Sequence, residues 1–151
     1  MLSNFVIPVV LLVNGLAAGV LVGTELGGFP LMAALPADRY VQAHAFFSTR
    51  YDPFMPACLV LTVLGDAVLA AVTSGGPSAL HALAGIAALG TVVISLTKNV
   101  PLNKWVRTVD PRNPPDDWQE RRRRWGQWNR RRAVMVTLAL ALNCAALGLG
   151  A

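Results

Sequence analysis

The sequence predicts an all-α fold: a four-helix transmembrane bundle with an interfacial amphipathic helix after span one and a cytoplasmic extension of the fourth helix. Of 151 residues, 54% are hydrophobic and only 14% are charged, which is low for a soluble protein. Four apolar stretches also approach or reach the roughly 20 residues that cross a bilayer. They lie at about 5–29, 54–73, 78–98 and 133–150, so we expect one integral membrane domain over 1–151.

The stretch at 5–29 is expected to be a retained span rather than a secretory signal. No basic residue precedes it, and it is longer than the apolar region of about 7–15 residues that a signal contains. Gly15, Gly19 and Gly23 recur every four residues along it. Such a stripe of small residues favours the close approach of another helix.

The next segment, 37–50, is predicted to form the amphipathic interfacial helix, because Tyr40, His44 and Phe47 lie three or four residues apart. Spans two and three are joined by a short turn, SGGP. Span three is expected to end where Pro101 removes a backbone donor. The last helical pattern runs from Asp117 to the C-terminus, long enough for its first half to project into water.

Basic residues predict the orientation. Arg39 and Arg50 lie between spans one and two, and every other Lys and Arg lies between Lys98 and Arg132. Because such residues favour the cytoplasmic side, we expect a multi-pass protein of the cytoplasmic membrane with both termini outside. The basic segment is expected to contact the bilayer surface, and nucleic acid is not an expected partner.

Polar side chains then meet at the cytoplasmic end of the bundle. Asn99 and Asn103 are four residues apart and are expected either to line a cavity or to bond carbonyls that Pro101 frees. His44, with a reference pKa near 6.5, is expected to shuttle a proton, the alternative being an interfacial histidine that faces water.

Glu25 is expected to act as a base or a metal ligand or, more simply, to pair with Arg50 or Arg132. In the last helix one face is expected to hold a set of aromatic and polar side chains at three- and four-residue steps: Trp118, Arg121, Trp125, Trp128, Asn129 and Arg132. Its tryptophans suit either an aromatic ligand or the membrane interface.

No tightly held metal is expected, because the chain has only two histidines and lacks the His-x-x-x-His and Glu-x-x-His spacings. No motif for another bound cofactor is present either.

Three segments resemble the anthrone oxygenase-like family of small four-span membrane proteins. They are Tyr51-Asp52-Pro53-Phe54-Met55-Pro56, the set Trp125, Trp128, Asn129 and Arg132, and the most specific one, Asn99-Val100-Pro101-Leu102-Asn103. The resemblance implies an oxygenase that converts polyketide anthrones, which are polycyclic aromatic natural-product intermediates, to anthraquinones. It implies dioxygen as the co-substrate and no flavin, haem or metal.

The resulting hypothesis is that His44 removes a proton from the aromatic substrate while Asn99, Asn103 and Arg132 hold its oxyanion. The residues expected to contact the substrate are Glu25, Tyr51, Trp125, Trp128 and Asn129. The alternatives are a non-oxidative membrane enzyme, such as a cyclase or isomerase, and a noncatalytic component that docks a soluble partner. Each is compatible with a homo-oligomer.

Overall fold

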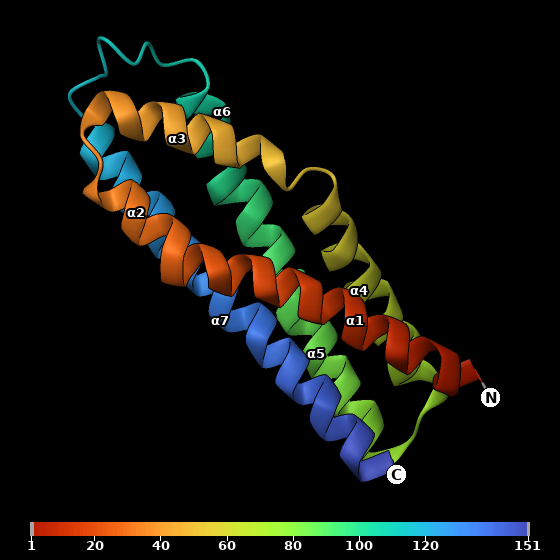
Figure 1. Ribbon diagram of the computed structural model, residues 1–151. Helices are drawn as coiled ribbons and strands as arrows, with labels where there is room; N and C mark the ends of the chain where they lie inside the picture. The colour runs from red at the N-terminus through yellow and green to blue at the C-terminus, as the bar shows by residue number, and fades with distance from the viewer. Residues whose placement is uncertain (1, 151) are drawn as a thin grey trace.

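The computed structural model describes residues 2–150, and this range is all-helical (Figure 1). Helices α1 (Leu2–Gly23), α4 (Phe54–Val72), α5 (Gly75–Ile94) and α7 (Trp118–Gly150) form an antiparallel bundle. In this bundle α1 and α5 each contact both α4 and α7. Four helical stretches are long and apolar enough to span a membrane, so the predicted fold class is confirmed.

The bundle buries small side chains and exposes large apolar ones. Its interior is rich in alanines, among them Ala17, Ala84, Ala88 and Ala139, all of them fully buried. Its outer surface carries Leu12, Leu61, Leu64, Ile86 and Leu138, each at least half exposed. Small interfacial residues let helix backbones approach closely where lipid leaves no hydrophobic drive for association. The surface therefore suits lipid.

Two spans run past the ends predicted near 29 and 98, because π-helical turns carry them through prolines. α1 continues through η1 (Thr24–Gly28) into α2 (Phe29–Ala34), and α5 continues through η2 (Ser95–Asn99) into α6 (Val100–Val106). Pro30 and Pro101 each stand two residues after such a turn. A π turn shifts the hydrogen-bond ladder by one residue, so the proline is accommodated without ending the helix.

Helix α3 (Ala37–Arg50) has the bounds predicted from the sequence and folds back beside α6 (Figure 1). It packs into a second core formed by Met32, Tyr40, Val41, Val106 and Trp125. The first half of α7 contributes Trp125 to this core, so one face of this extension packs against side chains of α2, α3 and α6.

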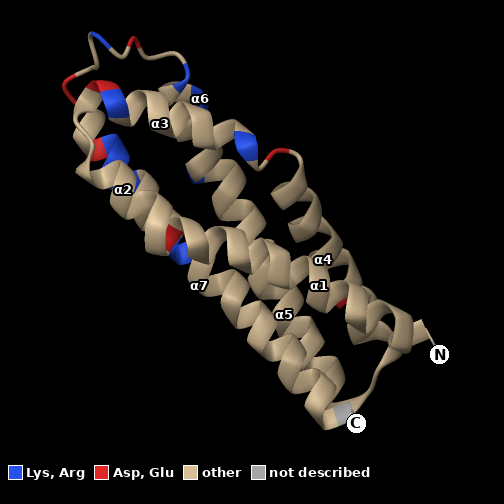
Figure 2. Cartoon of the chain, in the orientation of Figure 1, with Lys and Arg blue, Asp and Glu red and all other residues tan. Residues whose placement is uncertain are grey.

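Charged residues gather at the end of the molecule that contains α2, α3 and α6, whereas both termini lie at the opposite end (Figures 1 and 2). This distribution follows from the positions of Lys and Arg in the sequence. It divides the molecule into an apolar bundle and a charged end.

Arg122 ties the junction between α2 and α3 to α7. Its Nη1 donates to the carbonyl oxygens of Met32 at 3.3 Å and of Leu35 at 3.1 Å. Its guanidinium also lies over the ring of Trp118, 4.7 Å from the centroid. Leu35 N–H also donates to Met32 O, at a long 3.4 Å, so Arg122 reinforces this bond and gives the Leu35 carbonyl a donor where α2 ends.

We expect Arg122→Ala to lower the free energy of unfolding by about 1–3 kcal/mol, because two partly buried carbonyls lose a charged donor. Thermal denaturation in detergent measures the change. Arg123→Ala is the matched control, since Arg123 is exposed on the same helix. Equal effects of the two substitutions would contradict the role of Arg122.

Candidate functional site

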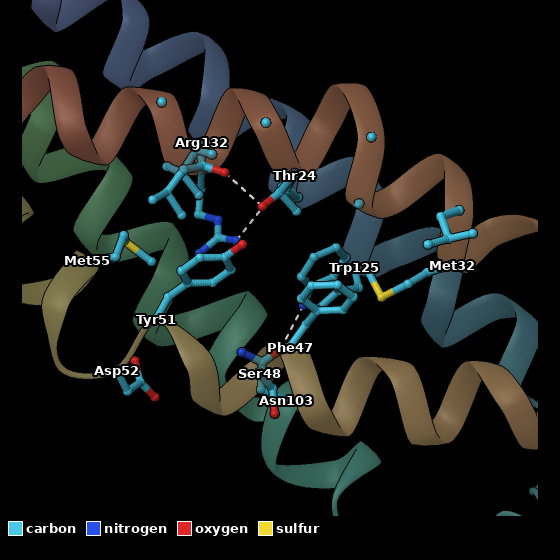
Figure 3. A pocket seen from close by; sticks show the side chains of 18 residues that line it. Thr24, Met32, Phe47, Ser48, Tyr51, Asp52, Met55, Asn103, Trp125 and Arg132 are labelled. Atoms are coloured by element: carbon cyan, nitrogen blue, oxygen red, sulfur yellow. Dashed lines mark hydrogen bonds between the residues drawn. The ribbon is translucent and has the colours of Figure 1, made fainter.

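A cavity of about 390 Å³ lies between the α1–α2 segment, the end of α3 and the first half of α7 (Figure 3). This volume falls within the range of small-molecule sites. Most of the lining is apolar or glycine: Gly19, Val20, Leu21, Gly23, Gly27, Gly28, Leu31, Met32, Phe47 and Met55. The polar and aromatic part of the lining is Thr24, Ser48, Tyr51, Asp52, Asn103, Trp125, Asn129 and Arg132.

Arg132 brings a buried cation to this cavity. Its side chain lies within the bundle with 5% of the residue exposed. Nη1 donates to Ser95 Oγ at 3.2 Å and Nη2 to Asn129 Oδ1 at 2.9 Å, while Nε is buried and without a partner. No carboxylate of residues 2–150 forms an ion pair with Arg132. A buried charge without a counterion strongly favours binding of an anion.

Glu25 pairs with neither of the expected arginines. It accepts from Arg130 Nε at 2.8 Å and from Asn129 Nδ2 at 3.1 Å, so the predicted pairing with Arg50 or Arg132 is wrong. The π turn η1 contains Glu25, and this residue lines a shallow pocket next to the main cavity. Asn129 therefore connects the Glu25 carboxylate to Arg132 through its two amide ends.

Asn103 is held in one orientation by two donors. Trp125 Nε1 donates to Asn103 Oδ1 at 2.7 Å. Since an indole nitrogen can only donate, this contact identifies the amide oxygen. His44 Nε2 lies 3.1 Å from the same oxygen and must therefore carry the hydrogen. The amide Nδ2 has no hydrogen-bond partner among the described residues, and Asn103 lines the cavity, so Nδ2 can donate to a ligand.

His44 lies behind Asn103 and is absent from the cavity lining. With Nε2 donating to Asn103, its remaining lone pair is on Nδ1, which accepts from the Tyr40 hydroxyl at 2.8 Å. Burial lowers the pKa of His44 to about 4, an effect that its bond to Asn103 partly opposes. Burial also raises the pKa of Tyr40. Both groups are therefore neutral near pH 7.

The remaining predicted residues divide between the cavity and its surroundings. Tyr51 lines the cavity, and its ring points towards Arg132 (Figure 3). Asn99 is fully buried outside the cavity, where its Nδ2 donates to the Trp125 carbonyl at 3.3 Å. Trp128 is also outside the lining, and its ring makes cation–π contacts with Lys98 and Arg131.

Sequence reasoning missed Thr24 and Ser48, whose side chains line the cavity. Ser48 precedes Tyr51 by three residues, so a shared helical face was the available signal. The sequence assigns no role to Asp66, an acidic residue of the second span. It is buried in α4, and neither of its carboxylate oxygens has a hydrogen-bond partner among residues 2–150.

Comparison with known families gives one match. Residues 44–142 match the model of a family described as anthrone oxygenase. No curated protein and no solved structure matches the chain. The matched range covers more than half of the 151 residues and includes Asn103 and Arg132, but it excludes the glycines of α1. Within the described part of the chain, no three His, Cys, Asp or Glu side chains gather as metal ligands would.

The pKa of His44 predicts a pH-dependent stability. In the unfolded chain the imidazole takes a proton near pH 6.5, whereas in the folded protein it stays neutral down to about pH 4. Unfolding therefore binds a proton in this window, and the free energy of unfolding falls as the pH drops. We expect His44 to contribute a loss of about 2 kcal/mol between about pH 7 and about pH 5.

Chemical denaturation in detergent at both pH values measures this loss. His44→Gln cannot titrate and keeps a donor for Asn103, so its loss of stability over the same interval should be smaller by that amount. Identical losses in the wild type and in His44→Gln would contradict the buried, neutral state of His44.

Proposed function

The chain belongs to the anthrone oxygenase family, and from this premise we propose that it oxidises an anthrone-like polycyclic aromatic intermediate of polyketide biosynthesis inside the membrane. Membership supports an oxygenase-like enzyme at the level of the family. The proposed co-substrate is dioxygen, and no bound cofactor takes part. One observation carries the proposal: Arg132 is a buried cation without a carboxylate partner among residues 2–150, in a largely apolar cavity.

Arg132 and Asn103 together hold the substrate oxyanion in this proposal. Two of the four Nη N–H donors of Arg132 remain after the bonds to Ser95 and Asn129, whereas Nε–H is buried within the bundle. Asn103 adds the free Nδ2 donor. Donors that are already oriented in an apolar site stabilise developing charge far better than water does, because they do not reorganise during the reaction. The pair therefore favours the enolate or phenolate form of the substrate.

Asp52 receives the substrate proton in this scheme. It is the carboxylate among the lining residues and is exposed to solvent, so the proton can pass on to water. His44 is assigned a positioning role in place of the base expected from the sequence, because its lone pair faces Tyr40. It holds Asn103 Oδ1 from behind and so presents Nδ2 to the ligand.

The redox step balances without a further reactant. Removal of a proton from the ring CH₂ group leaves an enolate, which transfers an electron to dioxygen. Recombination of the two radicals and return of the proton give a hydroperoxide on that carbon, and loss of water leaves a carbonyl group. The CH₂ group and O₂ thus become C=O and H₂O, so one oxygen atom enters the product, as in a monooxygenase.

A site in the membrane suits both reactants, since dioxygen and a flat aromatic molecule dissolve in lipid. The positive charges around α3 and α6 support a cavity near the cytoplasmic face of the cytoplasmic membrane, with both termini outside. The proposed partners are accordingly the bilayer and the aromatic substrate. The chain is then a multi-pass enzyme that meets its substrate in lipid.

Oxygen uptake tests the proposal and separates it from the two alternatives. Purified protein should consume dioxygen with dithranol, a dihydroxyanthrone, and release the anthraquinone. A cyclase or isomerase would turn over its substrate without dioxygen. A docking component would show no uptake and would co-purify with a soluble protein in stoichiometric amount.

We expect Arg132→Gln to lower kcat/KM for dithranol by about 10²–10³, the usual effect of removing an oxyanion donor. Arg131→Gln is the matched control, because Arg131 is exposed on the same helix and lies outside the cavity. Its kcat/KM should stay within about twofold of the wild type, as for other surface substitutions. Wild-type kcat/KM in Arg132→Gln would rule out oxyanion binding by this residue.

Two substitutions of His44 separate a base from a positioning residue. Glutamine can still donate to Asn103 Oδ1, whereas alanine cannot. If His44 positions Asn103, kcat of His44→Gln should stay within about tenfold of the wild type while His44→Ala loses about 10²-fold. Equal losses in the two variants, with the KM values unchanged, would restore the assignment of His44 as the base.

A further inference from the structure

We propose that Gly19, Gly23 and Gly27 form a wall of bare backbone against which a planar fused-ring ligand lies, with its oxyanion at Arg132. This inference rests on the proposed function and deepens it, because it specifies the shape of the molecule that the cavity selects. The glycine wall, as these three residues are called below, belongs to α1 and η1.

The glycine wall faces open space. A Cβ atom added at Gly19, Gly23 or Gly27 would meet no atom within 4 Å outside its own helix, yet all three residues line the cavity. The close helix contact expected from the stripe Gly15, Gly19 and Gly23 is therefore absent among the described residues. From Gly19 to Gly27 the wall extends over about 12 Å at 1.5 Å per residue, which is long enough for a three-ring system.

Arg132 is the independent sign that the space holds a ligand. A stripe of glycines alone would equally suit contact with a second copy of the chain. Arg132, however, is only 5% exposed, has no carboxylate partner among residues 2–150 and lines the same cavity. A helix surface that only faced lipid would not have an unpaired cation buried beside it, because an unpaired charge is costly within the membrane.

Flat and polarisable side chains also line the cavity. They are Phe47, Tyr51, Met55 and Trp125, and Figure 3 shows the rings of Tyr51 and Trp125 directed into the space. Aromatic rings and thioethers pack well on an aromatic face. A planar molecule between these groups and the glycine wall would contact protein over both faces, whereas a twisted molecule of similar size would collide with the backbone.

The rim of the cavity is open on an apolar side. Leu31 is 57% exposed and Tyr51 is 37% exposed, and both line the cavity. Leu31 belongs to the membrane-spanning stretch Leu2–Ala34. The ligand therefore reaches the glycine wall sideways from the lipid leaflet, without crossing the charged end of the molecule.

Binding of two stable probes to the detergent-solubilised full chain tests the glycine wall. Dantron is a planar dihydroxyanthraquinone. A benzophenone with one ortho hydroxyl group on each ring keeps the phenols and the carbonyl but is twisted. Quenching of tryptophan fluorescence reports binding of either probe. The variants are Gly23→Leu and the milder Gly23→Ala, with Gly15→Leu as the matched control, since Gly15 is on the same stripe but outside the cavity.

We expect the wild type to bind dantron at least about tenfold more tightly than the benzophenone, and Gly23→Leu to lose at least about tenfold in dantron affinity. Gly23→Ala should show a smaller loss, and Gly15→Leu should bind as the wild type does. Equal effects of leucine at Gly15 and Gly23 would overturn the inference and indicate a packing face. So would equal affinity for both probes, or a retained phospholipid that blocks both.

Failure of the wall and failure of the proposed function give different results. Normal oxygen uptake in Gly23→Leu would refute the glycine wall as a binding surface but would leave the proposed oxygenase activity standing. The opposite result is that the wild type binds dantron selectively, Gly23→Leu abolishes this binding, and the wild type consumes no oxygen. That result would support the glycine wall and refute the proposed oxygenase activity.

Discussion

The buried charge of Arg132 is the constraint on which the site depends. A guanidinium inside an apolar bundle is tolerated only if neighbouring groups solvate it. Ser95 of η2 and Asn129 of α7 accept hydrogen bonds from the guanidinium, and Asn129 in turn donates to the Glu25 carboxylate of η1. These contacts leave the cation short of one negative charge. A substrate oxyanion supplies that charge, so binding and electrostatic stabilisation come from the same residue.

Rigidity at Asn103 complements the charge at Arg132. An asparagine amide can be reversed at little cost when both its ends face water, but here Trp125 and His44 both donate to the oxygen. The nitrogen is thereby committed to the cavity. Tyr40 completes the arrangement by donating to His44, so α3, α6 and α7 must assemble before the donor is oriented. The second core around Met32 and Val41 is what brings them together.

Hydrophobic runs were sufficient to predict the four spans, and helical spacing was sufficient to predict α3. Topology also predicted that Tyr51, Asn103 and Arg132 meet at one end of the bundle, but it grouped His44 and Asn99 with them, and both lie outside the cavity lining. Other features depend on tertiary partners that no local pattern reveals. The direction of the His44 lone pair is decided by Trp125 through Asn103, and the partner of Glu25 depends on the turn of η1. The glycine stripe has the same sequence spacing whether another helix or a cavity faces it.

The two π-helical turns have a consequence for how this scaffold tolerates change in length. Each turn contains one residue more than a regular α-helix would use. Deleting a single residue from Ser95–Asn99 would convert the turn to α-helix without rotating the helix after it, because a π turn spreads the rotation of four α-helical residues over five. Asn103 would keep its direction, but the ring of Pro101 would then lie against the carbonyl four residues before it. Shortening by one residue therefore affects the helix at Pro101 more than the direction of Asn103, although the apolar span itself would remain long enough for the bilayer.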